Sequence, residues 1–247
     1  MTRTIAVIPA RYASMRFPGK ALADVRGKPL IQHVFQRARL LTTVDRVLVA
    51  TDDERIAQTV RCFGGTVVLT SPSHPSGTDR VAEAVRGEAA ELVVNLQGDE
   101  PLFDAKAVDE LVRVMTEDPA IAMGTLAHPI RDANEREEIN ATKVVLDQAG
   151  FALYFSRAPI PFRRQAGLAP TLRHIGIYVF RAAFLQRFAA LPPTPLERTE
   201  TLEQLRALEH GVRIRVLVTP HASLGVDTPG DLARLIAHLD EAGEPRA

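Results

Sequence analysis

The fold of this chain is constrained most by short apolar runs, rich in β-branched residues, that alternate with helical patterns. The runs are Thr4–Pro9, Arg46–Thr51, TVVLT from Thr66 and LVVNLQG from Leu92. Between the first two lies GKPLIQHVFQRARLL, whose apolar residues recur at helical spacing and whose Pro29 suits the first turn of a helix. Strands that are apolar throughout and joined by helices are typical of a parallel sheet covered on both faces. The sequence therefore predicts an α/β fold with a mostly parallel central sheet flanked by helices.

The second half of the chain departs from this alternation. KVVLDQAGFALYFSR predicts a hairpin around 148–150, and HIGIYVFR and VRIRVLVT predict two further strands. Helices are expected at Phe184–Leu191 and Glu197–His210. We expect a single domain over residues 1–247, in which residues 143–181 form a hairpin and flap.

Composition narrows the class of partner. Lys+Arg and Asp+Glu both number 30, so the formal net charge is zero. This balance argues against nucleic acid or an anionic membrane as partner, and a phosphate ligand would need a local cluster of cations. The one cysteine, Cys62, lies in the amphipathic run ERIAQTVRCF and is predicted to be a buried structural thiol. The apolar stretch near the N-terminus is too short for a signal peptide or a membrane span, so we expect a reducing cytoplasm.

Polar segments follow the predicted strands at the ends where an open parallel sheet binds its ligands. The first is RYASMRFPGK, which carries Arg11, Arg16 and Lys20. Guanidinium groups bind phosphate oxygens in pairs and lysine acts as a compact charge, so this segment is a candidate phosphate cradle. Ser14 and Gly19 would let the backbone approach the ligand. The alternative is a solvated basic loop without a ligand.

Two carboxylates stand at comparable positions. Asp99 lies in QGDEP after the fourth apolar run, and Asp227 lies in GVDTP. Carboxylates at strand ends suit Mg²⁺, although Asp227-Thr228-Pro229 is also a common helix start. A third segment, HPSGTDR, offers small residues beside Arg80 for a flat ligand, or a helix cap at Ser76 or Thr78. A basic loop with two strand-end carboxylates indicates Mg²⁺-assisted phosphoryl or nucleotidyl transfer.

Taken together, these motifs resemble one family. IPARYASMRFPGK, VATDDERI, HPSGTDR, NLQGDEP, KVVLDQAGFALYFSRAPIPF, RHIGIYVFR, LEQLRALEHG and GVDTPGDL occur in the order seen in the CMP-Kdo synthetases, the 3-deoxy-manno-octulosonate cytidylyltransferases. The resemblance runs from Ile5 to about Leu235. Each motif is moderately specific, whereas the joint set is highly specific, and YFSRAPIP with RHIGIY separates this family from other sugar nucleotidyltransferases.

The resemblance implies that CTP and the acidic eight-carbon sugar Kdo give CMP-Kdo and pyrophosphate with Mg²⁺, for lipopolysaccharide biosynthesis. It also implies a nucleotide-diphospho-sugar transferase fold, with an insertion on the sugar side, and a homodimer. The nucleotide-binding positions it implies are Arg11, Ser14, Arg16, Lys20, Ser76, Gly77 and Arg80. The metal ligands would be Asp99 and Asp227, which with Arg11 and Lys20 form the catalytic set. The sugar-binding positions would be Gln97, Arg157, His174, Tyr178, Glu203 and Gln204.

Two other functions stay open from the sequence. One is a CMP-sugar synthetase that acts on sialic acid or an amino-substituted Kdo, which would differ around Arg157–Tyr178. The other is a regulatory protein that binds nucleotide or sugar without turnover, whose expected signature is the loss of a metal carboxylate. The segment between Pro161 and Arg173 is shorter than in the family and is expected to form a flap near the sugar or the dimer contact.

Overall fold

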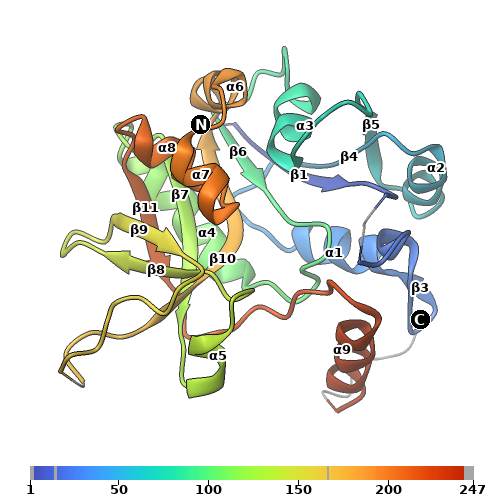
Figure 1. Cartoon of the computed structure of the whole chain (residues 1–247). Coiled ribbons are helices and arrows are strands. Elements are labelled where there is room, and N and C mark those ends of the chain that lie inside the picture. The colour runs from blue at the N-terminus through green and yellow to red at the C-terminus, as the bar shows by residue number, and fades with distance from the viewer. Residues whose placement is uncertain (1–2, 14–15, 166, 242–247) are drawn as a thin grey trace. The chain divides into compact units, whose positions relative to one another are not determined.

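The computed structural model describes residues 3–13, 16–165 and 167–241, and its chain divides into two compact units (Figure 1). The first unit comprises residues 1–105 and 223–247, and the second comprises residues 106–222. We describe each unit by itself. The expected single domain over residues 1–247 stays a prediction, whereas the α/β class is confirmed in both units.

The first unit is built on a parallel sheet. Its strands are β1 (Thr4–Ala10), β4 (Arg46–Thr51), β5 (Thr66–Leu69) and β6 (Leu92–Asn95), in the order β6-β1-β4-β5. The four apolar runs of the sequence are therefore the four strands. β1 is central, and its side chains from Ile5 to Ile8 are fully buried. Burial on both faces explains why β1 and β6 show no alternation of polar and apolar residues, whereas the edge strand β5 is partly exposed.

The helices between the strands set where a ligand can bind. They are α1 (Leu30–Ala38), α2 (Glu54–Cys62) and α3 (Gly77–Ala84). The chain moves outward from β1 to β4 and β5, and then returns through α3 to β6 on the other side of β1. Right-handed crossovers then place α1 and α3 on opposite sides of β1, as Figure 1 shows. The strand order reverses between β1 and β6, and open α/β sheets bind ligands at such a point.

Two local features of α2 concern its ends. Asp53 caps the helix, since its Oδ1 accepts from the backbone N–H of Arg55 at 3.0 Å. Cys62, the last residue of the helix, is exposed rather than buried. The prediction of a buried structural thiol was therefore wrong, because the last turn of the helix carries this residue away from the buried face of Ile56, Ala57 and Val60.

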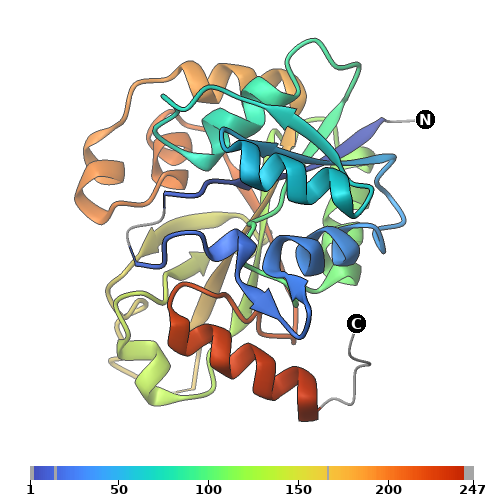
Figure 2. The same cartoon turned by 90° about the vertical axis from the view of Figure 1, so that its right-hand side faces the viewer.

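Within the first unit, an apolar cluster packs the C-terminal segment against the N-terminal part of the chain. It comprises Val25, Leu30, Val226, Leu235 and Leu239, all buried, with partly buried neighbours that include Phe17. Val25 lies in β2 (Asp24–Val25), which pairs with β3 (Lys28–Pro29), and Leu30 begins α1. Leu235 and Leu239 lie in α9 (Pro229–Glu241), and Val226 lies in the segment that precedes this helix. Figure 2 shows α9 beside the short segment of η1 (Lys20–Leu22), β2 and β3.

The start of α9 confirms the predicted helix signal. Pro229 is its first residue, and Thr228 Oγ1 accepts from the backbone N–H of Asp231 at 3.2 Å. The residue before this cap is Asp227. The cap and the apolar core therefore fix the position of the second predicted metal carboxylate.

The second unit contains a mixed sheet. Its strands are β7 (Met123–Pro129), β8 (Lys143–Leu146), β9 (Ala152–Ser156), β10 (Leu172–Arg181) and β11 (Ile214–Val218). β7 pairs with β11 in parallel and with β10 in antiparallel, and β8 and β9 form the predicted antiparallel hairpin. The helices are α4 (Ala105–Glu117), α5 (Ala133–Glu137), α6 (Ala182–Ala190), α7 (Pro195–Glu200) and α8 (Gln204–Glu209).

The single helix expected at Glu197–His210 is two helices. The chain breaks at Thr201, whose φ of 55° is left-handed. Arg157 stabilises this break, because its guanidinium donates to the backbone carbonyls of Glu200 (2.8 Å), Thr201 (3.3 Å) and Ile139 (3.1 Å). The carbonyls at the end of a helix lack partners within it, so a guanidinium from another element can cap them.

An irregularity in β10 surrounds one predicted site residue, His174. The register against β7 shifts between Ile175 and Tyr178, and Thr125 fills the bulge. The Thr125 hydroxyl has one hydrogen, which it donates to the carbonyl of Ile177 at 2.7 Å, so its oxygen accepts from His174 Nε2–H at 2.9 Å. Burial, and after it the nearby charge of Arg173, lowers the pKa of His174 to about 3. The imidazole is therefore neutral at neutral pH.

This neutral histidine predicts a pH-dependent stability. The pKa is about 3 in the folded protein and 6.5 in a free side chain, so the unfolded chain binds more protons between these values. The stabilising contribution is fully present above about pH 6.5 and falls, by up to about 1.4 kcal/mol per pH unit, as the pH drops. Urea unfolding from about pH 7.5 to about pH 5.5 should show a steeper loss in the wild type than in His174→Gln. Equal slopes in the two proteins would contradict this prediction.

Candidate active site

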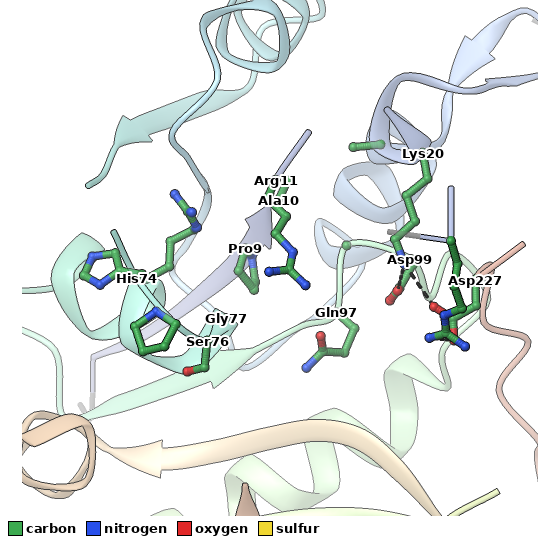
Figure 3. Close-up of a pocket in the computed structure, with 15 residues that line it drawn as sticks. Pro9, Ala10, Arg11, Lys20, His74, Ser76, Gly77, Gln97, Asp99 and Asp227 are labelled. Carbon is green, nitrogen blue, oxygen red and sulfur yellow. Dashed lines mark hydrogen bonds and ion pairs between the residues drawn. The ribbon is translucent and has the colours of Figure 1, made fainter. Parts of the chain in front are cut away.

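A cavity of about 310 Å³ lies in the first unit (Figure 3). The sequence-predicted residues that line it are Arg11, Arg16, Lys20, Ser76, Gly77, Arg80, Gln97, Asp99 and Asp227. Ser14, predicted to bind nucleotide, lies outside the described residues. The structure thus brings together segments that are more than 200 residues apart in the sequence.

The cavity opens at the point where the strand order reverses. Pro9 and Ala10 end β1, and Gln97 and Gly98 follow β6. These two strands are neighbours, so their carboxyl ends form one edge of the cavity. Gly98 is packed closely there, since a Cβ at this position would lie 2.8 Å from the carbonyl oxygen of Pro9. The cavity therefore lies at the sheet edge where the strand-end rule places a ligand site.

The two carboxylates of the site converge on one ammonium group. Lys20 Nζ donates to the Asp99 carboxylate, to Asp227 Oδ1 at 3.2 Å and to the carbonyl of Val226 at 3.3 Å. The backbone N–H of Val226 donates in turn to the carbonyl of Asp99 at 2.8 Å. Arg16 contacts the other oxygen of Asp227 at 3.0 Å. Figure 3 shows Lys20 reaching between Asp99 and Asp227.

The basic loop holds Lys20 in place through an aromatic anchor. The backbone N–H of Gly19 donates to the carbonyl of Tyr12 at 2.8 Å, and Gly19 has a φ of 73°. A Cβ on Gly19 would lie 3.1 Å from the Tyr12 ring, so both conformation and space favour glycine. The guanidinium of Arg55 covers the same ring at 3.4 Å from its centroid, and Asp53 pairs with Arg55. Gly19 therefore shapes the loop, and the close approach of its backbone to a ligand stays a prediction.

The other end of the cavity is formed by the start of α3. Ser76 caps this helix, because its Oγ accepts from the backbone N–H of Asp79 at 3.2 Å, and it also lines the cavity. Arg80 is buried and is held by Thr70 Oγ1 at 2.6 Å and Asp52 Oδ2 at 3.2 Å. Asp52 is thus the ion-pair partner of Arg80.

His74 is a lining residue that sequence reasoning missed. It contacts the Glu83 carboxylate, which also accepts from the backbone N–H of Ser71 at 2.9 Å. The hydrogen bond from His74, and then that from Ser71, lowers the pKa of Glu83. The signal available in the sequence was a histidine in a loop of serines and prolines, SPSHPSG, followed by a glutamate on the next helix.

The remaining sugar-binding predictions fall in the second unit. Tyr178 and Gln204 are 7% and 4% exposed, and the rings of His174 and Tyr178 lie 5.4 Å apart between centroids. Gln204 begins α8 and Glu203 directly precedes it. The roles of these residues and of Arg157 in binding a sugar stay predictions.

The donor set of the cavity fits a hard cation. Asp99 and Asp227 offer carboxylate oxygens, and Mg²⁺ binds through one or two carboxylates while keeping several waters. Within residues 3–13, 16–165 and 167–241, no group of three or more His, Cys, Asp or Glu side chains is gathered to hold a metal. The pair therefore suits an ion that a phosphate ligand completes, rather than an ion enclosed by protein.

None of the helices in the described part of the chain combines the length and the apolar character that crossing a bilayer requires.

Comparisons with known proteins agree with the motifs. The family model described as Cytidylyltransferase matches residues 5–214. The 3-deoxy-manno-octulosonate cytidylyltransferase of Geobacter sulfurreducens is 51% identical over 245 residues, which cover 95% of this chain and 98% of the relative. That of Anaeromyxobacter sp. is 54% identical over 249 residues and covers all of both chains. The chain belongs to this family of cytidylyltransferases. It is accordingly an enzyme of the nucleotidyltransferase class.

A solved structure supports the same assignment. A CMP:2-keto-3-deoxy-manno-octonic acid synthetase complexed with CTP superposes with a TM-score of 0.93 at 44% identity, covering 98% of this chain and 100% of that one. A 4-diphosphocytidyl-2C-methyl-D-erythritol synthase from Anaerococcus prevotii, at 12% identity and a TM-score of 0.63, shares the fold. The family named from the motifs is confirmed, and so is the fold class.

Two adjacent aspartates allow a matched test of the site's electrostatics. The side chain of Arg80 is 5% exposed and that of its partner Asp52 is 20% exposed, whereas Arg55, the partner of Asp53, is 59% exposed. Asp52→Asn should lower the free energy of unfolding by about 2–3 kcal/mol, because it leaves a buried guanidinium without its counter-charge. Asp53→Asn should cost less than about 1 kcal/mol, since asparagine keeps the helix cap and the ion pair is at the surface. Urea unfolding measures the free energy of unfolding of both variants. Equal losses of this free energy would show that the buried Asp52–Arg80 pair stabilises the protein no more than the exposed Asp53–Arg55 pair.

Proposed function

We propose that this enzyme transfers the cytidylyl group of CTP to Kdo, giving CMP-Kdo and pyrophosphate in a Mg²⁺-dependent reaction. We further propose that it acts as a homodimer in the cytoplasm and supplies lipopolysaccharide biosynthesis. The observation that carries the proposal is the cavity at the β1–β6 edge, where four cations and two carboxylates meet in a chain about half identical to cytidylyltransferases of that name.

The nucleotide half of the proposal rests on the charge of the cavity. Arg11, Arg16 and Lys20 would bind the triphosphate, because a chain with zero net charge needs a local cluster to attract a polyanion. Ser76, Gly77 and Arg80, at the other end of the cavity, would contact the cytosine. The braced guanidinium of Arg80 supports this role, since a fixed donor reads a base edge better than a mobile one.

The chemical step would be an in-line displacement. The anomeric hydroxyl of Kdo attacks the α-phosphorus of CTP, the bond to the bridging oxygen of pyrophosphate breaks, and the hydroxyl proton is released to solvent. Asp99 and Asp227 would hold Mg²⁺, which supplies Lewis-acid stabilisation of the phosphoryl charge. Arg11 and Lys20 would neutralise charge on the phosphates, and positioning would supply most of the remaining rate.

The sugar half of the proposal draws on the second unit. Among the described residues, Arg157 donates three of its five N–H groups to the carbonyls of Glu200, Thr201 and Ile139, and the other two would bind the carboxylate of an acid sugar. Neutral His174 would act as a hydrogen-bonding group rather than as a cation. A synthetase for sialic acid or an amino-substituted Kdo would share the first-unit cavity, so the sugar identity is tested separately below.

A dimer is supported by apolar side chains exposed on the second unit. Phe162 and Leu168, in the flap between Pro161 and Arg173, are 88% and 77% exposed. Ile139 and Leu153 are exposed as well. Exposed apolar side chains that gather into one patch mark protein interfaces, so we propose that these side chains contribute to the contact between the two copies.

The proposal is tested by pyrophosphate release from the purified enzyme with Mg²⁺, CTP and Kdo. UTP, sialic acid and an amino-substituted Kdo replace the substrates in parallel, and EDTA replaces the metal. Turnover should require CTP, Kdo and metal together. Faster turnover of another acid sugar would refute the Kdo assignment, and binding of CTP without any turnover would favour a regulatory protein.

Asp99→Asn should lower kcat by at least about a hundredfold, because it removes one of two carboxylates proposed to hold the metal. Its fold should be intact, since the Asp99 side chain is partly exposed and its backbone bond to Val226 is kept. Activity at saturating Mg²⁺ and thermal unfolding measure the two expectations. Near-normal activity would remove Asp99 from the metal site.

A further inference from the structure

The ammonium of Lys20 has no hydrogen left for a phosphate in this structure. It has three N–H groups, and the contacts to Asp99, Asp227 and the carbonyl of Val226 account for all three. The same lysine is proposed to bind the triphosphate, and the same carboxylates are proposed to bind Mg²⁺. These roles cannot be filled together in this arrangement, so the side chain must change partners when ligands bind.

The arrangement has a clear electrostatic cause. The backbone bond from Val226 to Asp99 and the buried position of Val226 hold two carboxylates close together. Two negative carboxylates in contact with the same ammonium repel each other. The positive charge of Lys20, whose side chain is only 18% exposed, offsets that repulsion. Asp227 has a second cation in Arg16, but of the two only Lys20 bridges both carboxylates.

We propose that Lys20 is an exchangeable counter-ion. It occupies the carboxylate pair in the ligand-free enzyme, and it transfers to the phosphates of the nucleotide when a divalent cation takes its place between Asp99 and Asp227. This inference rests on the proposed function. A divalent cation and an ammonium repel each other at one site, so the metal binds weakly alone and the nucleotide, by drawing Lys20 away, strengthens metal binding.

The exchange predicts effects of opposite sign for one substitution. Lys20→Met removes the competing charge, so Mn²⁺, used as the probe, should bind the nucleotide-free protein about tenfold tighter than it binds the wild type. CTP in EDTA should bind Lys20→Met more weakly than the wild type, because the substitution removes a positive charge from the cavity and leaves both carboxylates to repel the triphosphate. If Lys20 were only a structural brace, the substitution would weaken both ligands.

The controls separate this effect from a general change in charge. Lys28→Met removes one lysine charge from β3 of the same unit, away from the lining residues of the cavity, and should leave Mn²⁺ affinity unchanged. The double variant Lys20→Met/Asp99→Asn should lose the tighter binding, because the gain depends on the carboxylate pair. Lys20→Gln serves if the methionine variant does not fold. Isothermal titration calorimetry measures each affinity.

Mn²⁺ affinity in Lys20→Met that equals or falls below that of the wild type would overturn the inference. So would an equal gain in Lys28→Met. Failure of this inference is distinguishable from failure of the proposed function, because the pyrophosphate assay of the wild type tests the proposed function separately. If the wild type is active but Lys20→Met does not bind Mn²⁺ more tightly, the proposed reaction stands and the exchange is rejected. If the wild type is inactive but Lys20→Met binds Mn²⁺ more tightly, the proposed reaction is rejected and the competition between Lys20 and the cation stands.

Discussion

The site depends on one backbone hydrogen bond, from the N–H of Val226 to the carbonyl of Asp99. It joins the segment before α9 to the end of β6, and so places two carboxylates side by side from distant parts of the sequence. The apolar core around Val226, Leu235 and Leu239 supplies the free energy that keeps this segment in place. Because burial stabilises the approach, the enzyme can tolerate repulsion between the carboxylates, and that repulsion makes the pair a site for cations.

The cations of the cavity divide into two kinds. Arg80 is buried and fixed by Asp52 and Thr70, so its position is set before any ligand arrives. Arg16 and Lys20 belong to a loop, and both pair with carboxylates of the site itself. One end of the cavity is therefore preorganised, which suits the proposed contact with cytosine. At the other end the proposed exchange requires the ion pairs to rearrange when metal and phosphate bind.

Sequence reasoning succeeded where a local pattern determines structure. Continuous apolar runs gave the strands, and the strand-end rule then located Arg11, Gln97 and Asp99 in one cavity. It failed where a distant residue decides the outcome. The helix expected at Glu197–His210 is interrupted because Arg157, more than 40 residues away, caps the carbonyl at Glu200. The contacts of Lys20 with Val226 and both carboxylates also depend on tertiary packing, so they could not be predicted from the spacing of residues in the sequence.

The residue type at position 20 is explained by this contact. Three acceptors from two segments converge on one point, and an ammonium offers three donors around a compact charge, whereas a planar guanidinium would direct its donors into one plane. A compact charge is also the closest match among side chains to a small divalent ion surrounded by oxygens. The flexible four-carbon stem then allows the ammonium to move to a neighbouring phosphate while the backbone stays anchored at Tyr12. A lysine side chain can therefore occupy the position between the carboxylates in the absence of a cation and leave it when a cation binds.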